Sequence, residues 1–159
     1  MKFFGNIFIF IFVSVIYWLF ANNFSFLSIA PNILFTSAIS LAILLNPVIA
    51  LTFCFFWGLY ADMMGVNAFG AYALIYTLLC YAVHLSKKHF DFDMPIPQIA
   101  LIFILSVLSF LFYQLLSLIF LNISPLPLKN LFIEPFINSI LMPFVFAIFY
   151  YAQRKLKIL

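Results

Sequence analysis

The chain has 159 residues, of which 68% are hydrophobic and only 7% are charged. A soluble domain carries about a quarter charged residues, so this composition excludes an ordinary water-soluble globule. The formal net charge of +3 does not indicate nucleic acid, because the seven basic residues lie between or beside apolar segments, as membrane topology signals do. We therefore expect one all-α integral membrane domain over residues 1–159.

Proline, asparagine and lysine divide the chain into six apolar segments, each of which is predicted to be a transmembrane helix. Several segments begin with proline, which suits the first turn of a helix. The segments on either side of Asn46-Pro47 are short for a membrane about 30 Å thick, so an alternative is a kinked, buried pair that does not fully cross. The predicted spans are 4–20, 31–45, 47–63, 68–85, 97–121 and 135–151.

The first apolar segment follows a lysine, as a signal peptide would. Because no small-residue cleavage site follows it, we expect a retained span. Cytoplasmic loops collect Lys and Arg, so the basic residues also predict the orientation. Six spans with a cytoplasmic N-terminus place only Lys129 outside, and place inside Lys2, Lys87, Lys88, Arg154, Lys155 and Lys157. Both termini are thus predicted to face the cytoplasm.

Asp62 is the most informative polar residue within the apolar segments, because a charged side chain in lipid is costly unless it is paired. Helical spacing places Gly58, Asp62 and Gly65 on one side of the third predicted span. A neighbouring backbone would then approach closely beside the carboxylate. The alternative is that the span ends near Ala61 and Asp62 is hydrated at the interface.

Two predicted spans carry polar stripes that should face the bundle interior and mainly bond helix to helix. The stripes are Tyr72, Tyr76, Cys80 and His84, and Ser106, Ser109, Tyr113 and Ser117 with Gln114 beside them. The sixth span opens with Glu134, which would also suit a helix N-terminus as a favourable charge. In the predicted orientation six polar residues lie at the same depth in the outer half of the membrane, namely Asp62, Tyr72, Gln114, Ser117, Glu134 and Asn138.

The sequence offers few groups for catalysis or metal binding. His84 and His89 are five residues apart, which is not metal-ligand spacing on a helix, and no HExxH motif is present. There is no GxSxG, P-loop or GxGxxG motif. Cys54 and Cys80 lie in apolar segments and indicate no disulfide framework. We therefore expect no enzymatic activity, no cofactor and no metal.

Three segments together resemble the bacterial rod shape-determining MreD proteins. Residues 58–74, GLYADMMGVNAFGAYAL, resemble that family's Gly-x-x-x-Asp followed by a Gly and a small-residue helix. Residues 31–34, PNIL, resemble the entry to its second apolar stretch, and residues 134–143, EPFINSILMP, resemble its last span. The resemblance implies a non-enzymatic inner-membrane component of the cell-wall elongation machinery. It also implies a fold similar to the six-helix substrate-binding subunits of energy-coupling-factor transporters.

The partners implied by the resemblance are MreC, the actin-like MreB filament, and the transpeptidase and glycosyltransferase pair that builds peptidoglycan. The leading hypothesis is a scaffold that presents a small-residue groove to a partner's membrane helix. The alternative is a solute-binding subunit of a vitamin-type transporter, in which Tyr72, Gln114 and Asn138 hold the ligand. The residues predicted to bind a partner are Gly58, Asp62, Gly65, Gly70, Tyr72, Glu134 and Asn138.

Overall fold

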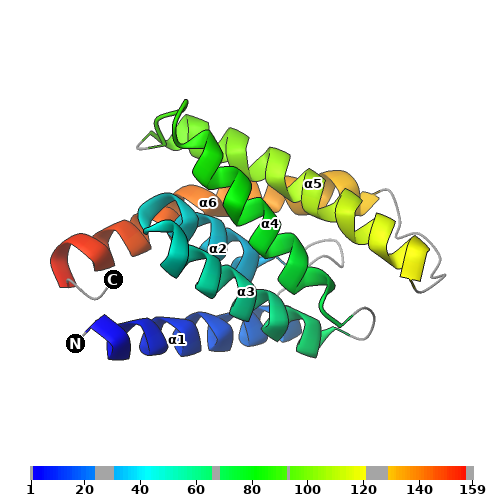
Figure 1. Cartoon of the computed structure of the whole chain (residues 1–159), viewed down its shortest axis with the longest axis horizontal. Coiled ribbons are helices and arrows are strands. Elements are labelled where there is room, and N and C mark those ends of the chain that lie inside the picture. Colours follow the sequence, from blue (N-terminus) through cyan, green and yellow to red (C-terminus); the bar gives the residue numbers. More distant parts are fainter. Residues whose placement is uncertain (1, 24–30, 66–68, 93, 121–128, 157–159) are drawn as a thin grey trace.

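The computed structural model describes residues 2–23, 31–65, 69–92, 94–120 and 129–156, and these ranges fold into six α-helices without a β-strand (Figure 1). The predicted all-α class and the six helices are therefore confirmed. In chain order the helices are α1 (Lys2–Asn23), α2 (Ile33–Leu44), α3 (Pro47–Met64), α4 (Ala71–Ser86), α5 (Pro95–Phe120) and α6 (Lys129–Leu156).

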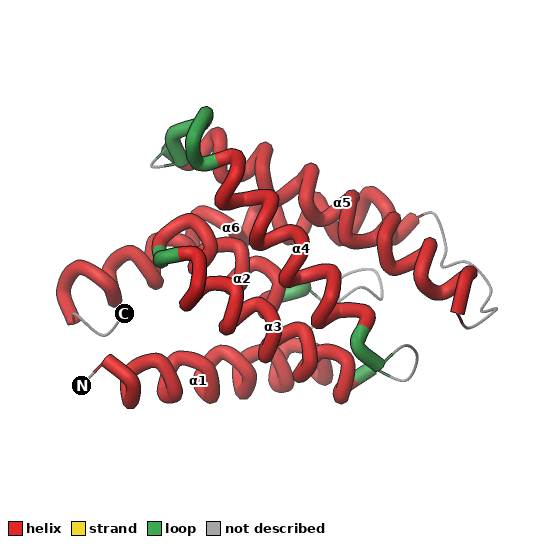
Figure 2. Tube along the Cα trace, viewed as in Figure 1, coloured by secondary structure: helices red, strands yellow, loops and turns green. Residues whose placement is uncertain are grey.

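The start of α1 and the end of α6 lie at the same end of the bundle (Figure 1). The connection between α4 and α5, drawn as a green loop in Figure 2, lies at that end too. It carries Lys87 and Lys88, and Arg154 lies in the last turns of α6. Most basic residues of the described chain are thus gathered at one end of the bundle, as the predicted orientation requires.

The short helix α2 lies in the middle of the bundle and packs against α1, α3, α4 and α6 (Figure 2). Eleven of its 12 residues are buried, and at 1.5 Å per residue it is about 18 Å long. A helix that is apolar on every side is expected inside a protein rather than on its surface. The alternative prediction of a buried segment that does not fully cross the membrane therefore fits α2. It does not fit α3, which has 18 residues and is long enough to cross.

The six predicted spans form helices of unequal length. Among the described residues three stretches are long and apolar enough to cross a membrane, namely Pro47–Met64, Pro95–Phe120 and Asn130–Arg154. The apolar parts described for the other helices are shorter, namely Phe8–Leu19, Ile33–Leu44 and Ala71–Ser86. The shorter α2 is accommodated because protein, rather than lipid, covers it.

Two predicted helix starts differ from the structure by three residues or more. Pro135 was predicted to open the last span, but α6 already begins at Lys129, so both Pro135 and Pro143 lie inside it. Proline often marks a first turn, but the same residue inside a helix gives no signal of the turns before it. The fourth span was predicted from 68, but α4 begins at Ala71 because Gly70 adopts a left-handed φ of 95° directly before it.

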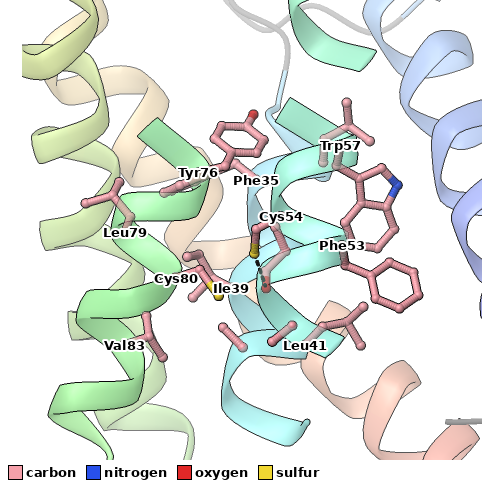
Figure 3. Packing of buried hydrophobic residues seen from close by; sticks show 14 of the residues in the cluster. Phe35, Ile39, Leu41, Phe53, Cys54, Trp57, Tyr76, Leu79, Cys80 and Val83 are labelled. Atoms are coloured by element: carbon pink, nitrogen blue, oxygen red, sulfur yellow. Dashed lines mark hydrogen bonds between the residues drawn. The ribbon is translucent and has the colours of Figure 1, made fainter. Parts of the chain in front are cut away.

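The core is built where α2, α3 and α4 meet (Figure 3). Trp57 is fully buried, and its ring lies 5.2 Å from Phe53 and 5.9 Å from Phe10 of α1. Cys54 and Cys80 are buried free thiols, and the Cys54 Sγ donates to a backbone carbonyl of α2 at 3.7 Å. Both cysteines therefore fill the core as small apolar side chains.

Candidate functional site

Asn32 directly precedes α2, and its side chain is the centre of a hydrogen-bond network at the N-terminal end of that helix. Its Oδ1 accepts a bond from the backbone N–H of Phe35 at 3.1 Å, which caps α2, and another from the Tyr76 hydroxyl of α4 at 2.9 Å. Its Nδ2 donates to Oε1 of Glu134 in α6 at 3.4 Å. One amide side chain thus connects the start of α2 to α4 and α6.

Asn138 of α6 extends this network to α5. It is fully buried, and its Oδ1 accepts a bond from the backbone N–H of Asn32 at 3.0 Å. Its Nδ2 donates to the Ser106 hydroxyl of α5 at 3.2 Å. A buried amide is costly unless it is hydrogen-bonded, and here both polar atoms of Asn138 have partners. Four helices are therefore joined by side chains at one level of the bundle.

Tyrosine rings of α4 and α5 lie beside this network. The Tyr72 ring lies 5.9 Å from the ring of Tyr76, whose hydroxyl donates to Asn32. The Tyr72 ring stacks on Tyr113 of α5, with ring centroids 4.8 Å apart and an interplanar angle of 18°. Of the residues predicted to share one depth, the structure thus brings together Tyr72, Glu134 and Asn138.

Asp62 joins α3 to the start of α4. Its side chain is 6% exposed, so the alternative in which it is hydrated at the interface is wrong. One carboxylate oxygen accepts from the backbone N–H of Tyr72 at 2.9 Å, and the other accepts from that of Ala73 at 3.0 Å. Because these donors belong to the first turn of α4, which lacks intrahelical acceptors, Asp62 acts as the cap of that helix.

The predicted close approach beside Asp62 is made by α4 of the same chain. A Cβ atom built on Gly58 would lie 2.7 Å from the Ala73 backbone nitrogen and 2.7 Å from the Tyr72 carbonyl oxygen. Gly58 therefore allows the α3 and α4 backbones to touch. A Cβ on Gly65 would meet the Ala61 oxygen at an ordinary 3.4 Å, and nothing lies within 4 Å of a Cβ on Gly70.

The polar stripes face the interior, as predicted. Tyr76 and Cys80 are fully buried in α4, whereas Tyr72 and His84 at the two ends of that stripe are partly exposed. The stripe of α5 is buried throughout, namely Ser106, Ser109, Tyr113 and Ser117. Not every member bonds across helices, since the Ser117 hydroxyl donates to a carbonyl of its own helix at 2.7 Å.

The other end of α2 is also tied to its neighbours. The Lys87 ammonium, just after α4, donates to the Ala42 carbonyl at 3.5 Å, and the Gln153 amide of α6 donates to the Leu44 carbonyl at 3.4 Å. These carbonyls belong to the last turn of α2, where cations are favoured and acceptors lack helical donors. Burial lowers the pKa of Lys87 from its ordinary value.

No sequence signal singled out the contacts of Asn32, Lys87 and Gln153. Asn32 did appear in the resemblance to a known family, and an Asn before an apolar run is a recognised N-cap pattern. Its bonds to α4 and α6 join residues 44 and 102 positions apart, so only the folded chain reveals them.

Among the described residues no group of three or more His, Cys, Asp and Glu side chains is placed to hold a metal ion.

The fold and this network define a helical membrane protein whose interior polar groups mainly hold helices together. The chain matches the family of the rod shape-determining protein MreD over residues 1–152, and it belongs to that family. This membership implies a role in rod shape determination, and the family is a structural one rather than a known family of enzymes. It gives no support to the solute-binding alternative.

No curated protein and no solved structure matches the chain. The similarity to energy-coupling-factor subunits therefore stays a prediction.

Proposed function

We propose that this protein is a non-enzymatic scaffold of the cell-elongation machinery in the bacterial inner membrane, which couples MreC and the MreB filament to peptidoglycan synthesis. The observation that carries this proposal is the family match over residues 1–152. The packing supports the scaffold role, because the side chains of Asn32, Asp62 and Asn138 form hydrogen bonds with neighbouring helices of the same chain. Contact at the lipid-facing surface is then the means by which the protein acts.

We infer that a partner helix docks on a groove between α3 and α4, which we name the α3–α4 groove. The groove has a volume of about 660 Å³ and is lined by Leu51, Phe55, Leu59, Gly70, Ala73, Leu74, Thr77, Leu78 and Tyr81. Gly70, Ala73 and Thr77 follow one another at steps of three and four, and small residues at such spacing let a second helix approach closely. The open space at Gly70 favours the same surface.

This inference narrows the set of partner-binding residues predicted from the sequence. Gly70 lines the α3–α4 groove, and Tyr72 lies two residues further along the chain. Gly58 and Asp62 contribute by holding α3 and α4 together beneath the groove. Gly65 lies at the end of α3, while Glu134 and Asn138 belong to the network around Asn32.

Thr77 provides the test, because it lies in the α3–α4 groove and is only partly buried. Thr77→Phe fills the groove and should abolish co-purification of MreC, whereas the isosteric Thr77→Val should retain it. Ala100→Phe is the matched control, because Ala100 is exposed in a second apolar groove, between α5 and α6. Equal recovery of MreC with Thr77→Phe and with the unchanged protein would refute docking at this groove.

We further propose that both termini face the cytoplasm. The start of α1 and the end of α6 share one end of the bundle (Figure 1), and the α4–α5 connection at that end contains Lys87 and Lys88. Positive residues are retained on the cytoplasmic side of a membrane. In this orientation Asn32, Glu134 and Asn138 lie in the outer half of the bilayer, and Lys87 and Gln153 lie at the cytoplasmic end of the bundle.

A further inference from the structure

Helix α4 is short, like α2, but one of its sides is exposed at the surface of the bundle. Its 16 residues extend over about 24 Å, which is less than the roughly 30 Å of hydrocarbon in a typical bilayer. About half of each side chain is exposed at Leu74, Leu78, Tyr81 and Leu85. Unlike the buried α2, this helix therefore meets the lipid with an apolar band that is narrower than the membrane.

Two lysines fix the cytoplasmic edge of this band. Lys87 and Lys88 follow Ser86 directly, at the end of the bundle proposed to face the cytoplasm. A lysine side chain can extend toward the headgroups of a thicker bilayer. The Lys87 ammonium is instead held at the last turn of α2 by its bond to the Ala42 carbonyl at 3.5 Å. The band of α4 is therefore limited to the length of the helix.

Helix α3, which packs beside α4, is only slightly longer. Its 18 residues extend over about 27 Å, and the exposed side chains on it include Phe55 and Phe56. We name the exposed apolar surface of these two helices the α3–α4 face, and it contains the α3–α4 groove. The whole of this face is thus shorter than the hydrocarbon region of a typical bilayer.

Helix α5 shows the opposite relationship to the membrane. Its exposed apolar side chains run from Ile96 to Phe120, which are about 36 Å apart along the helix. The end of α5 lies well beyond the start of α4 (Figure 1). Tilting shortens the span of a long helix, whereas no tilt lengthens a short one. The mismatch at α4 therefore remains however the bundle is oriented.

We propose that the α3–α4 face thins the bilayer beside it and selects phospholipids with short acyl chains. A helix shorter than the hydrocarbon region is accommodated by local thinning, and short chains fill a thinner layer with less strain. These lipids occupy the face while no partner is docked, and a partner helix in the α3–α4 groove would displace them. The proposal concerns the free protein, so it does not rest on the docking of MreC.

The test uses the full chain in phospholipid vesicles, with a tryptophan reporter on each side. Trp18→Phe removes the exposed native tryptophan, while Trp57 is fully buried and gives a constant background. Leu78→Trp then reports on the lipids beside α4, and Leu111→Trp, at a leucine of similar exposure in α5, is the matched control. The vesicles contain brominated dioleoyl-phosphatidylcholine, which quenches tryptophan on contact, mixed with an unbrominated phosphatidylcholine of shorter or longer chains.

We expect the short-chain dimyristoleoyl lipid to displace the quenching lipid from Leu78→Trp about threefold more effectively than the long-chain dierucoyl lipid, as a mismatch of several Å would give. At Leu111→Trp the short-chain lipid should have no such advantage. Lys88→Leu extends the apolar band of α4 by about one turn and should reduce the preference at Leu78→Trp, whereas Lys88→Arg should keep it.

Leu74→Trp is a second reporter on the exposed side of α4, and it covers the case in which Leu78→Trp does not fold. Equal displacement by the short-chain and long-chain lipids at the reporters on α4 would overturn the proposal. The same short-chain preference at Leu111→Trp would also overturn it, because the thinning would then not belong to the α3–α4 face. MreC is absent from these vesicles, so the result is independent of the test with Thr77→Phe.

Discussion

Gly58 of α3 packs directly against the backbone of Ala73 in α4, with no room for a side chain between them. Gly58→Ala would place a Cβ atom 2.7 Å from the Ala73 nitrogen. Because backbone cannot move aside as a flexible side chain does, we expect a loss of about 1–3 kcal/mol, seen as a lower midpoint of thermal unfolding in detergent. Gly65→Ala is the matched control, and an equal loss there would contradict this explanation.

Asp62 should contribute to stability as the cap of α4. Asp62→Ala leaves the N–H groups of Tyr72 and Ala73 without their acceptor, and such losses cost about 1–3 kcal/mol for each buried group. Asp62→Asn should lose less, because its amide oxygen still accepts one bond. Denaturant titration in mixed micelles measures both values. Thr52→Ala, at an exposed position, should change the free energy of unfolding by less than about 0.5 kcal/mol.

Tyr76 and Asn138 should be energetically coupled although they do not bond to each other. Both are bonded to Asn32, and residues of one network show coupling energies of about 0.5–3 kcal/mol. A double-mutant cycle with Tyr76→Phe and Asn138→Ala measures this coupling. In a second cycle, Tyr76→Phe and Thr52→Ala should be additive, and additivity in both cycles would show that Asn32 does not connect the two residues.

The two ends of the chain should lie on the same, cytoplasmic side of the membrane. Green fluorescent protein fused to either end should therefore fluoresce, whereas alkaline phosphatase fused to the C-terminal end should be inactive. Active phosphatase at that end, together with a fluorescent N-terminal fusion, would place the termini on opposite sides.

The sequence predicted the features that depend on local pattern. Apolar segments between prolines, asparagines and lysines identified six helices, and helical spacing placed Ser106 and Tyr113 on the buried side of α5. Spacing also placed Gly58 beside a neighbouring backbone, but it did not identify the neighbour as α4 of the same chain. That choice depends on which helices pack together, which a pattern within one helix does not contain.

The predictions were less successful where tertiary contacts replace a local signal. Pro135 lies inside α6, so the turns before it were missed. The position of Asn32 before an apolar run indicates a helix N-cap, yet its hydrogen bonds also reach residues about one hundred positions away in the chain. The predicted span 31–45 is also slightly longer than α2, which begins only after its cap residue Asn32.

Helix α6 is attached to α2 at both of its ends, through Asn138 to Asn32 and through Gln153 to the Leu44 carbonyl. Two such attachments, separated by the length of α2, prevent one helix from sliding or pivoting against the other. We therefore expect α2 and residues 138–153 of α6 to move together as one body.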